Sequence, residues 1–315
     1  MEETELLNKI KILNETIWDR NEAFGSCVEL WLSNFKKESY SGKNERLHAL
    51  FLLSKFLYFG EIQIKEMLKA LYRDLYKYPL ICKIRRDNGD TLNEDLIKAK
   101  FHEELQATRF LGIGNPSESG VFLLYPFRQE NNLKRDLFIY SHEIFTEEKV
   151  GEKAVLKIKD PAIRHYVFID DLCSSGTQAT SYSKEIVSKL KALSPSVDVQ
   201  YLVLMGLTEG MSASRVATGF DRIEAVFTLD SSFKCFNTTS RYFAVTDKDI
   251  NKQFAEEFCQ KYGDKLRPGH ALGYRNNQLL LGFNHNIPDN TLPIICCGGN
   301  ANFKWNPVFK RVEKR

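Results

Sequence analysis

Apolar residues in the first third of the chain recur at steps of three and four residues. Residues 6–17 show this spacing, and it returns three times before residue 79. Such a period places the apolar side chains on one face of a helix. The pattern predicts successive helices with stops at Gly60 and at Pro79, followed by a further helix over about residues 93–108.

Beyond residue 108 the pattern changes to short apolar runs that alternate with helical segments or loops. The runs cover residues 110–113, 137–144, 166–169, 201–207 and 223–229. The run at 166–169 is apolar at every position, which is typical of a central parallel strand covered by helices on both faces. A helix is predicted directly after it, over about residues 178–193. This part of the chain therefore predicts an α/β fold with a central, mainly parallel sheet.

The predicted elements divide the chain into three parts. Residues 1–92 form an N-terminal helical region, residues 93–245 an α/β core, and residues 246–315 a C-terminal cap. The cap opens with a helix predicted to begin after Thr246 and to end at Gly263. Its tail is dense in Asn, Gly, Pro and aromatic residues, and because its apolar residues need burial we expect a folded cap rather than a linker.

Composition narrows the class of protein. The chain has 315 residues, of which 43% are hydrophobic and 27% charged, and these values exclude a disordered chain. The 44 basic and 41 acidic residues give a net charge of +3, so direct nucleic-acid binding is not indicated. The acidic N-terminus and the lack of a long apolar run predict neither a signal peptide nor a membrane span. Seven cysteines without a CxxC pair favour a reducing, cytoplasmic setting and give little support to a zinc site.

The segment 166–178, YVFIDDLCSSGTQ, carries the clearest chemistry. Two acids, Asp170 and Asp171, follow the buried run, and a short loop of small residues leads into the predicted helix. Ligands of parallel sheets bind at the carboxyl ends of strands, and a helix N-terminus attracts anions. The loop therefore suits a phosphate group. The two acids would repel that phosphate, so they suit vicinal hydroxyls or a metal ion carried by a second phosphate. The alternative is a helix N-cap with solvated carboxylates.

This segment resembles the ribose-phosphate signature of the type I phosphoribosyltransferases, in which four apolar residues and two acids precede a gap and a Thr/Ser-Gly loop. The resemblance implies a phosphoribosyltransferase sheet and a ligand that is phosphoribosyl pyrophosphate or a related nucleotide. It gives Asp170 and Asp171 the catalytic role of facing the ribose hydroxyls. It also implies Mg²⁺ that is held through the ligand's pyrophosphate, with no direct protein ligand. The residues implied to bind the 5′-phosphate are Cys173, Ser174, Ser175, Gly176 and Thr177.

A narrower resemblance extends from about residue 40 to the C-terminus. Gln178 stands where nucleotide-salvage members usually have Thr, which points away from ordinary salvage activity. The SGTQ ending, the upstream GNPSESG and the distal HNIPDNTLP look closer to phosphoribosyltransferase-like proteins of bacterial conflict and antiphage systems, some of them associated with retrons. This implies an enzyme of antiviral defence whose N-terminal helices contact protein partners. The alternative is a non-catalytic nucleotide sensor or scaffold of a defence complex.

A second segment, GIGNPSESG at residues 112–120, lies between an apolar run and a predicted helix. By the same resemblance an early strand-to-helix loop contacts the pyrophosphate, and the implied residues are Gly114, Asn115, Ser117, Glu118, Ser119 and Gly120. The alternative is an ordinary Asn-Pro turn with Ser117 or Ser119 as the helix N-cap. Arg128, Lys134 and Arg135 follow and either neutralise pyrophosphate charge or are simply solvated.

Residues 146–164 contain four lysines between two predicted strands. The family carries a mobile catalytic loop at this place, and the alternative is an exposed, charged hairpin. Cys173 is a weak candidate for a nucleophile because no histidine lies near it in the sequence.

Overall fold

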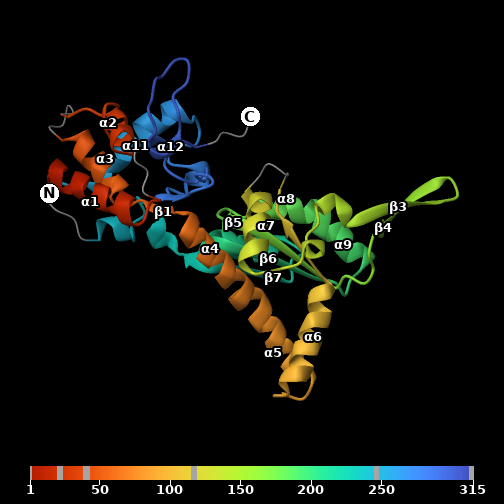
Figure 1. Ribbon diagram of the computed structural model, residues 1–315. Helices are drawn as coiled ribbons and strands as arrows, with labels where there is room; N and C mark the ends of the chain where they lie inside the picture. The colour runs from red at the N-terminus through yellow and green to blue at the C-terminus, as the bar shows by residue number, and fades with distance from the viewer. Residues whose placement is uncertain (1, 20–23, 38–42, 115–118, 245–247, 312–315) are drawn as a thin grey trace. The chain divides into compact units, whose positions relative to one another are not determined.

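A computed structural model describes residues 2–19, 24–37, 43–114, 119–244 and 248–311. The chain folds as two compact units, one formed by residues 1–64 with residues 230–315 and the other by residues 65–229 (Figure 1). Residues 65–92, which the sequence pattern groups with the N-terminal helices, thus lie within the second unit. The division of the chain into three functional parts stays a prediction. In the described part of the chain, no helix has the length and apolar character to cross a membrane.

The first unit joins the two ends of the chain around one aromatic-rich core. Trp31 is fully buried, and its indole N–H donates to the carbonyl of Ile294 over 2.7 Å. The indole N–H of Trp305 donates to the same carbonyl over 3.1 Å. A short parallel pair of strands, β1 and β8, also links the two ends. The main elements of this unit are α1 (Glu3–Thr16), α2 (Phe24–Leu32), α3 (Glu45–Leu53), β1 (Leu57–Phe59), the start of α4 (Glu61–Ala70), α11 (Lys252–Leu266), β8 (Leu281–Phe283) and α12 (Pro293–Cys296).

The second unit is an α/β domain built on a four-stranded sheet in which every pairing is parallel. The strand order is β2-β5-β6-β7, so β5 lies inside the sheet, with β2 and β6 on either side. The predicted fold class is confirmed by this topology. The strands are β2 (Thr108–Gly112), β5 (His165–Cys173), β6 (Asp198–Leu207) and β7 (Arg222–Leu229). The helices are η1 (Leu71–Lys77), α5 (Tyr78–Asp87), α6 (Glu94–Gln106), α7 (Ser119–Glu130), α8 (Thr177–Tyr182), η4 (Ser183–Val187), α9 (Ser188–Leu193) and α10 (Thr208–Ala217).

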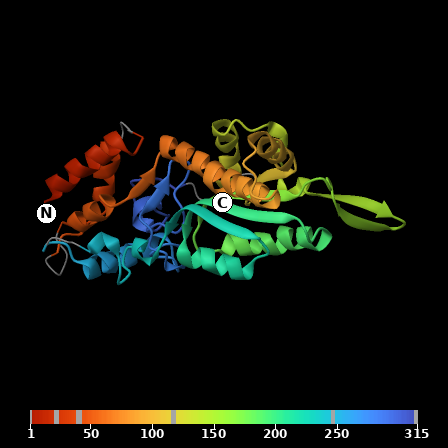
Figure 2. The ribbon, with the colours of Figure 1, turned by 90° about the horizontal axis from the view of Figure 1, so that it is seen from below.

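Helices cover both faces of this sheet. On one face, Phe168 and Tyr201 pack in a single core with Val187 and Leu190 of the helical run 177–193. On the other face η1 packs on β6 and β7, and α7 packs on β2 and β5 (Figure 2). Burial on both faces explains why the interior strands are apolar at nearly every position rather than at alternate ones.

The lysine-rich segment after residue 144 is a two-stranded antiparallel hairpin, made of β3 (Phe145–Val150) and β4 (Lys153–Ile158). Gly151 has a φ of 64° at its turn, a conformation that favours glycine. Both views show the hairpin projecting from the sheet (Figures 1 and 2), and most of its side chains are exposed. The hairpin is thus confirmed as a structure, whereas a part in catalysis stays a prediction.

Two element predictions in the α/β unit were wrong. The apolar run 137–144 is not a strand, because 3₁₀ turns at Arg135–Leu137 and Ser141–Glu143 leave only one isolated bridge, between Phe110 and Phe138. Pro79 does not end the preceding helix either. It occupies the first turn of α5, directly after the π-helical η1, and a missing N–H is tolerated at that position.

The predicted end of the cap helix was also wrong. Helix α11 continues past Gly263 to Leu266, and Asn251 caps its start by accepting a hydrogen bond from the N–H of Phe254. A Cβ at Gly263 would lie 2.0 Å from the carbonyl oxygen of Ala271, so this glycine serves a close backbone approach rather than a helix stop. Thr246, the expected cap, lies outside the described residues.

The amino end of β5 carries a histidine between two carboxylates. His165 Nε2 lies 2.8 Å from Glu104 Oε2, and His165 Nδ1 lies 3.0 Å from Asp198 Oδ2. Burial acts to lower the pKa of His165, but the hydrogen bonds with Asp198 and Glu104 outweigh it, and the pKa is raised overall. A protonated His165 donates to both acids and joins α6 to the ends of β5 and β6.

We expect His165→Gln to destabilise the protein in a pH-dependent way. Because the folded pKa is raised, the stabilisation by His165 is complete below about pH 6.5, its unfolded value, and is lost as the pH rises through the folded value. At about pH 5.5 the substitution should lower the free energy of unfolding by roughly 1.5 to 3 kcal/mol, the worth of a hydrogen bond to a charged group. At about pH 9 the loss should be smaller. Denaturant unfolding followed by circular dichroism at both pH values measures it.

His102→Gln is the matched control, since this histidine is exposed on α6. It should change stability little at either pH. An equal loss at both pH values for His165→Gln would show that packing, not the protonated imidazole, stabilises this end of the sheet.

Candidate functional site

The two candidate acids are the sixth and seventh of the nine residues of β5, and both lie past the end of one neighbouring strand. Strand β2 stops at Gly112, which pairs with Ile169. Strand β6 continues, pairing with β5 as far as Cys173. The strand thus runs four residues beyond the apolar run from which it was predicted. Asp170 and Asp171 are therefore held by a parallel strand on one side only, at the carboxyl edge of the sheet where ligands of such sheets bind.

Asp170 is surrounded by protein groups and is only 1% exposed. Its Oδ1 accepts hydrogen bonds from the hydroxyl of Ser119, over 3.2 Å, and from the N–H of Asp171, over 2.9 Å. Its Oδ2 accepts the hydroxyl of Tyr201, over 3.2 Å. One carboxyl group thus connects the start of α7, the end of β5 and the middle of β6.

The pKa of Asp170 is raised well above its usual range. Burial is the largest cause, and the charge of Asp171 is the second. The pKa of Tyr201 is likewise raised well above its usual range, first by burial and second by the charge of Asp170. These shifts favour the neutral forms of both groups, because a low-dielectric site penalises charge. The neutral form of Asp170 is thus more favourable here than it would be for an exposed carboxyl group.

Asp171 points to the opposite face of the strand, because side chains alternate along β5. It is 8% exposed, so it is more accessible than Asp170 but still buried. The two acids, which are adjacent in sequence, thus lie at the same edge of the sheet. They differ in burial and in the face of β5 to which they point.

The candidate phosphate loop is a tight turn between β5 and the helical run 177–193. Gly176 is the N-cap residue of α8, and its backbone has a left-handed conformation with a φ of 72°. Ser175 and Thr177 are half-buried, and their hydroxyl oxygens lie 2.9 Å apart. Ser174 is 8% exposed. Of the hydroxyls in this loop, those of Ser175 and Thr177 are the better placed to meet a ligand.

Helix α10 supports the loop from beneath. A Cβ at Gly176 would lie 2.4 Å from Ser214 Oγ and 2.9 Å from the carbonyl oxygen of Gly210. A Cβ at Gly210 would lie 1.8 Å from the carbonyl oxygen of Ser174. Two glycines therefore allow the loop and the helix to approach closely, and this contact fixes the shape of the turn.

Cys173 does not have the properties of a nucleophile. It is 2% exposed, and its Sγ lies 3.7 Å from Ser214 Oγ. Burial raises the pKa of the thiol to about 11, which keeps it protonated near neutral pH. Cys173 thus contributes to the packing under the loop.

The candidate pyrophosphate segment is described only at its two ends. Asn115, Ser117 and Glu118 lie outside the described residues. Gly114 has a φ of 98°, and Ser119 begins α7 with its hydroxyl on Asp170.

Gly112 and Gly120 explain how α7 comes so close to the sheet. A Cβ at Gly112 would lie 2.4 Å from the N atom of Val121. A Cβ at Gly120 would lie 2.7 Å from the carbonyl oxygen of Ile169. The start of α7 is consequently pressed against the ends of β2 and β5, directly beside the acids.

Three residues of this site were missed by the sequence analysis. Tyr201 stands in an apolar run where only its hydroxyl signals a polar partner, and Gly210 and Ser214 belong to a helix with no recognisable motif. No group of three or more His, Cys, Asp and Glu side chains that could hold a metal ion is present among the described residues.

The site consists of an interior parallel strand with two acids near its end, followed by a glycine-capped turn and a helix. This arrangement defines a phosphoribosyltransferase-like α/β protein. The PRTase-CE family matches residues 28–311, and the chain belongs to this family. No curated protein matches the chain.

Several solved structures are similar to this chain. One is orotate phosphoribosyltransferase from Aeropyrum pernix, with 15% identity over 54% of this chain and 73% of that chain, and a TM-score of 0.29. Another is xanthine-guanine-hypoxanthine phosphoribosyltransferase from Helicobacter pylori, with 8% identity over 55% of this chain and 89% of that chain, and a TM-score of 0.29. A third is adenine phosphoribosyltransferase from Trypanosoma brucei, with 14% identity over 43% of this chain and 65% of that chain, and a TM-score of 0.23.

We expect Gly176→Ala to destabilise the protein by more than backbone strain alone. A residue with a Cβ in the left-handed region costs about 1 kcal/mol. At Gly176 the new methyl group would also overlap Ser214 and Gly210, so the total should reach roughly 2 to 4 kcal/mol. Denaturant unfolding of the purified variant measures this loss.

Gly151→Ala is the matched control, because Gly151 has a similar φ of 64° and a Cβ at this position would have nothing within 4 Å. It should cost only about 1 kcal/mol. Equal losses in the two variants would mean that the contact between the loop and α10 does not constrain the turn.

Proposed function

We propose that this protein binds phosphoribosyl pyrophosphate or a related nucleotide at the carboxyl end of β5 and transfers its phosphoribosyl group. The observation that carries the proposal is the glycine-capped turn 173–177, which follows an interior parallel strand and opens a helix. Membership of the PRTase-CE family supports it. In this proposal the turn holds the 5′-phosphate through backbone N–H groups and the hydroxyls of Ser175 and Thr177.

The two acids take different parts in the proposed reaction. Asp171, the more exposed, accepts hydrogen bonds from the ribose hydroxyls. Asp170 positions the start of α7 through Ser119 and contributes to the ribose site once its buried network rearranges. A nucleophile forms a bond to C1′ while the C1′–oxygen bond to pyrophosphate breaks, and the pyrophosphate departs with the electron pair. The protein's contribution is to position the reactants and to stabilise charge.

Mg²⁺ fits this site as a partner of the ligand. Carboxylate and phosphate oxygens are the hard ligands that Mg²⁺ prefers, and Asp171 is the carboxylate best placed to meet its hydration shell. When bound with the pyrophosphate, the ion would neutralise charge on the leaving group. The residues of the candidate pyrophosphate loop would contact the same pyrophosphate, namely Gly114, Asn115, Ser117, Glu118, Ser119 and Gly120.

A nucleotide sensor or scaffold without turnover is the second candidate function. The observation that favours it is the burial of Asp170, whose carboxyl already accepts three protein hydrogen bonds. An acid engaged in this way stabilises a binding loop without reaching a substrate.

Under either candidate we propose a role in a bacterial antiphage system, with partners bound by the N-terminal helices. That role rests on the resemblance of the SGTQ, GNPSESG and HNIPDNTLP motifs, and phage challenge of cells with and without the intact gene tests it.

Asp171→Asn should weaken the binding of phosphoribosyl pyrophosphate while leaving the fold intact. Loss of a charge-assisted hydrogen bond costs about 1.5 to 3 kcal/mol, which corresponds to a roughly tenfold to hundredfold rise in Kd. Ser175→Ala with Thr177→Val should weaken ribose 5-phosphate as well, because those hydroxyls face the phosphate. Calorimetry with Mg²⁺ present measures both effects.

Ser188→Ala serves as the control in the same helical run, where its hydroxyl donates to the carbonyl of Ser183. Its affinity should equal that of the parent protein. If Asp171→Asn and the loop double variant also bind with parental affinity, the ligand does not occupy this end of β5.

Turnover separates the two candidate functions. A transferase should release pyrophosphate from phosphoribosyl pyrophosphate when offered its acceptor, and removal of Mg²⁺ by a chelator should abolish the release. A coupled assay for pyrophosphate, run across a panel of bases, nucleosides and amines, measures it. Tight binding without release against the whole panel would instead favour the sensor.

A further inference from the structure

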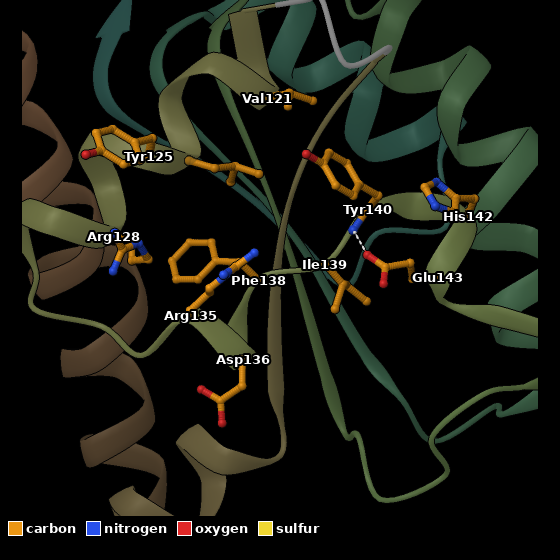
Figure 3. A pocket seen from close by; sticks show the side chains of 11 residues that line it. Val121, Tyr125, Arg128, Arg135, Asp136, Phe138, Ile139, Tyr140, His142 and Glu143 are labelled. Carbon is orange, nitrogen blue, oxygen red and sulfur yellow. Dashed lines mark hydrogen bonds between the residues drawn. The ribbon is translucent and has the colours of Figure 1, made fainter.

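A pocket of about 910 Å³ lies between α7 and the segment 135–143, entirely within the α/β unit (Figure 3). Its volume falls in the range of pockets that hold nucleotide-sized ligands. The lining residues that matter for its chemistry are Tyr125, Arg128, Arg135, Phe138, Tyr140 and His142. None of them belongs to the acids or to the loop of the candidate site.

Two guanidinium groups give the pocket its positive charge. Among the described residues, neither Arg128 nor Arg135 has an ion-pair partner, and the contact that Arg128 makes is with the ring of Tyr125, 5.7 Å from its centroid. Two carboxylates also line the pocket. Glu143 accepts the N–H of Tyr140 over 2.8 Å, and Asp136 points away from the rings (Figure 3). Within the described residues, neither carboxylate forms an ion pair with Arg128 or Arg135, so both guanidinium groups keep their hydrogen-bond donors for another acceptor.

Aromatic rings form the other part of the wall. Tyr125 is 63% exposed and Tyr140 is 49% exposed, so a large part of each side chain is accessible. Tyr140 stacks on His142 with the ring planes 9° apart and the centroids separated by 5.6 Å. Phe138 also lines the pocket, beside the side chain of Arg135 in this view (Figure 3). Such rings provide flat faces on which another ring can stack.

We propose that this pocket is a second ligand site, which binds an aromatic ring that carries a phosphate group, as in a nucleoside monophosphate. The planar forks of Arg128 and Arg135 match phosphate oxygens, and the tyrosine rings stack on the base. The pocket shares no residue with Asp170, Asp171 or the loop at residues 173–177. The proposal assigns Arg128 and Arg135, which the sequence also offered as pyrophosphate contacts, to a second ligand instead.

Calorimetric titration of the full chain with AMP tests this site. Arg128→Gln with Arg135→Gln should weaken AMP binding at the pocket at least roughly tenfold, since each charged hydrogen bond contributes more than about 1.4 kcal/mol. Tyr140→Leu should weaken it as well, through loss of stacking. Lys134→Gln is the matched control: it removes one positive charge beside the pocket without lining it, and it should bind as the parent does.

Two further arms separate this site from the phosphate loop. Ser175→Ala with Thr177→Val should keep the AMP binding that the arginine double variant loses. Adenosine has the aromatic base without the phosphate group, and inorganic phosphate lacks the base. Both should therefore bind at least roughly tenfold more weakly than AMP.

Three outcomes would overturn the second site. One is an absence of AMP binding to the parent protein up to about 1 mM. Another is AMP binding that is lost in the loop variant and kept in the arginine variant, which would instead support the proposed function. The third is a concentration-dependent dimer in sedimentation that is abolished by Tyr140→Leu, since a second copy of the chain would then cover the rings.

Discussion

The parallel pairing of β5 with strands on both sides is the constraint on which the α/β unit depends. β2 stops opposite Ile169, while β6 continues to Cys173. The last residues of β5 therefore pair with β6 alone. Pairing with β6 keeps the backbone of this strand end fixed on one side. The start of α7 occupies the other side, where β2 has ended.

The space that β2 leaves is filled through backbone contacts rather than side-chain packing. Gly112 and Gly120 let the start of α7 touch the ends of β2 and β5, and Gly210 lets α10 touch the turn at Ser174. Between these contacts sits the carboxyl of Asp170, joined to Ser119 and Tyr201. A buried carboxyl without such partners would cost several kcal/mol, so the two hydroxyls are required by its burial as well as by any function.

The sequence predicted the parts of this arrangement that depend on local pattern. An uninterrupted apolar run, two acids, small loop residues and a helical period were enough to predict an interior strand, a turn and a helix in that order. The sequence could not predict Tyr201, Gly210 or Ser214, because their roles come from contacts between strands and helices far apart in the chain. The errors at Pro79, Gly263 and residues 137–144 have a related cause. Each prediction rests on a usual local effect, but other features determined the outcome. These are the place of Pro79 in the first turn of α5, the close approach of Gly263 to Ala271, and the 3₁₀ turns at 135–137 and 141–143.

Helix α7 connects the two regions of greatest chemical interest in the α/β unit. Its first residue, Ser119, donates to Asp170, and its next two turns present Tyr125 and Arg128 to the pocket. The helix cannot move closer to the sheet, because backbone atoms at Gly112, Gly120 and Ile169 are already in contact. The position of Ser119 beside Asp170 therefore depends on these glycines, because a side chain at either position would push the start of α7 away from the strand ends.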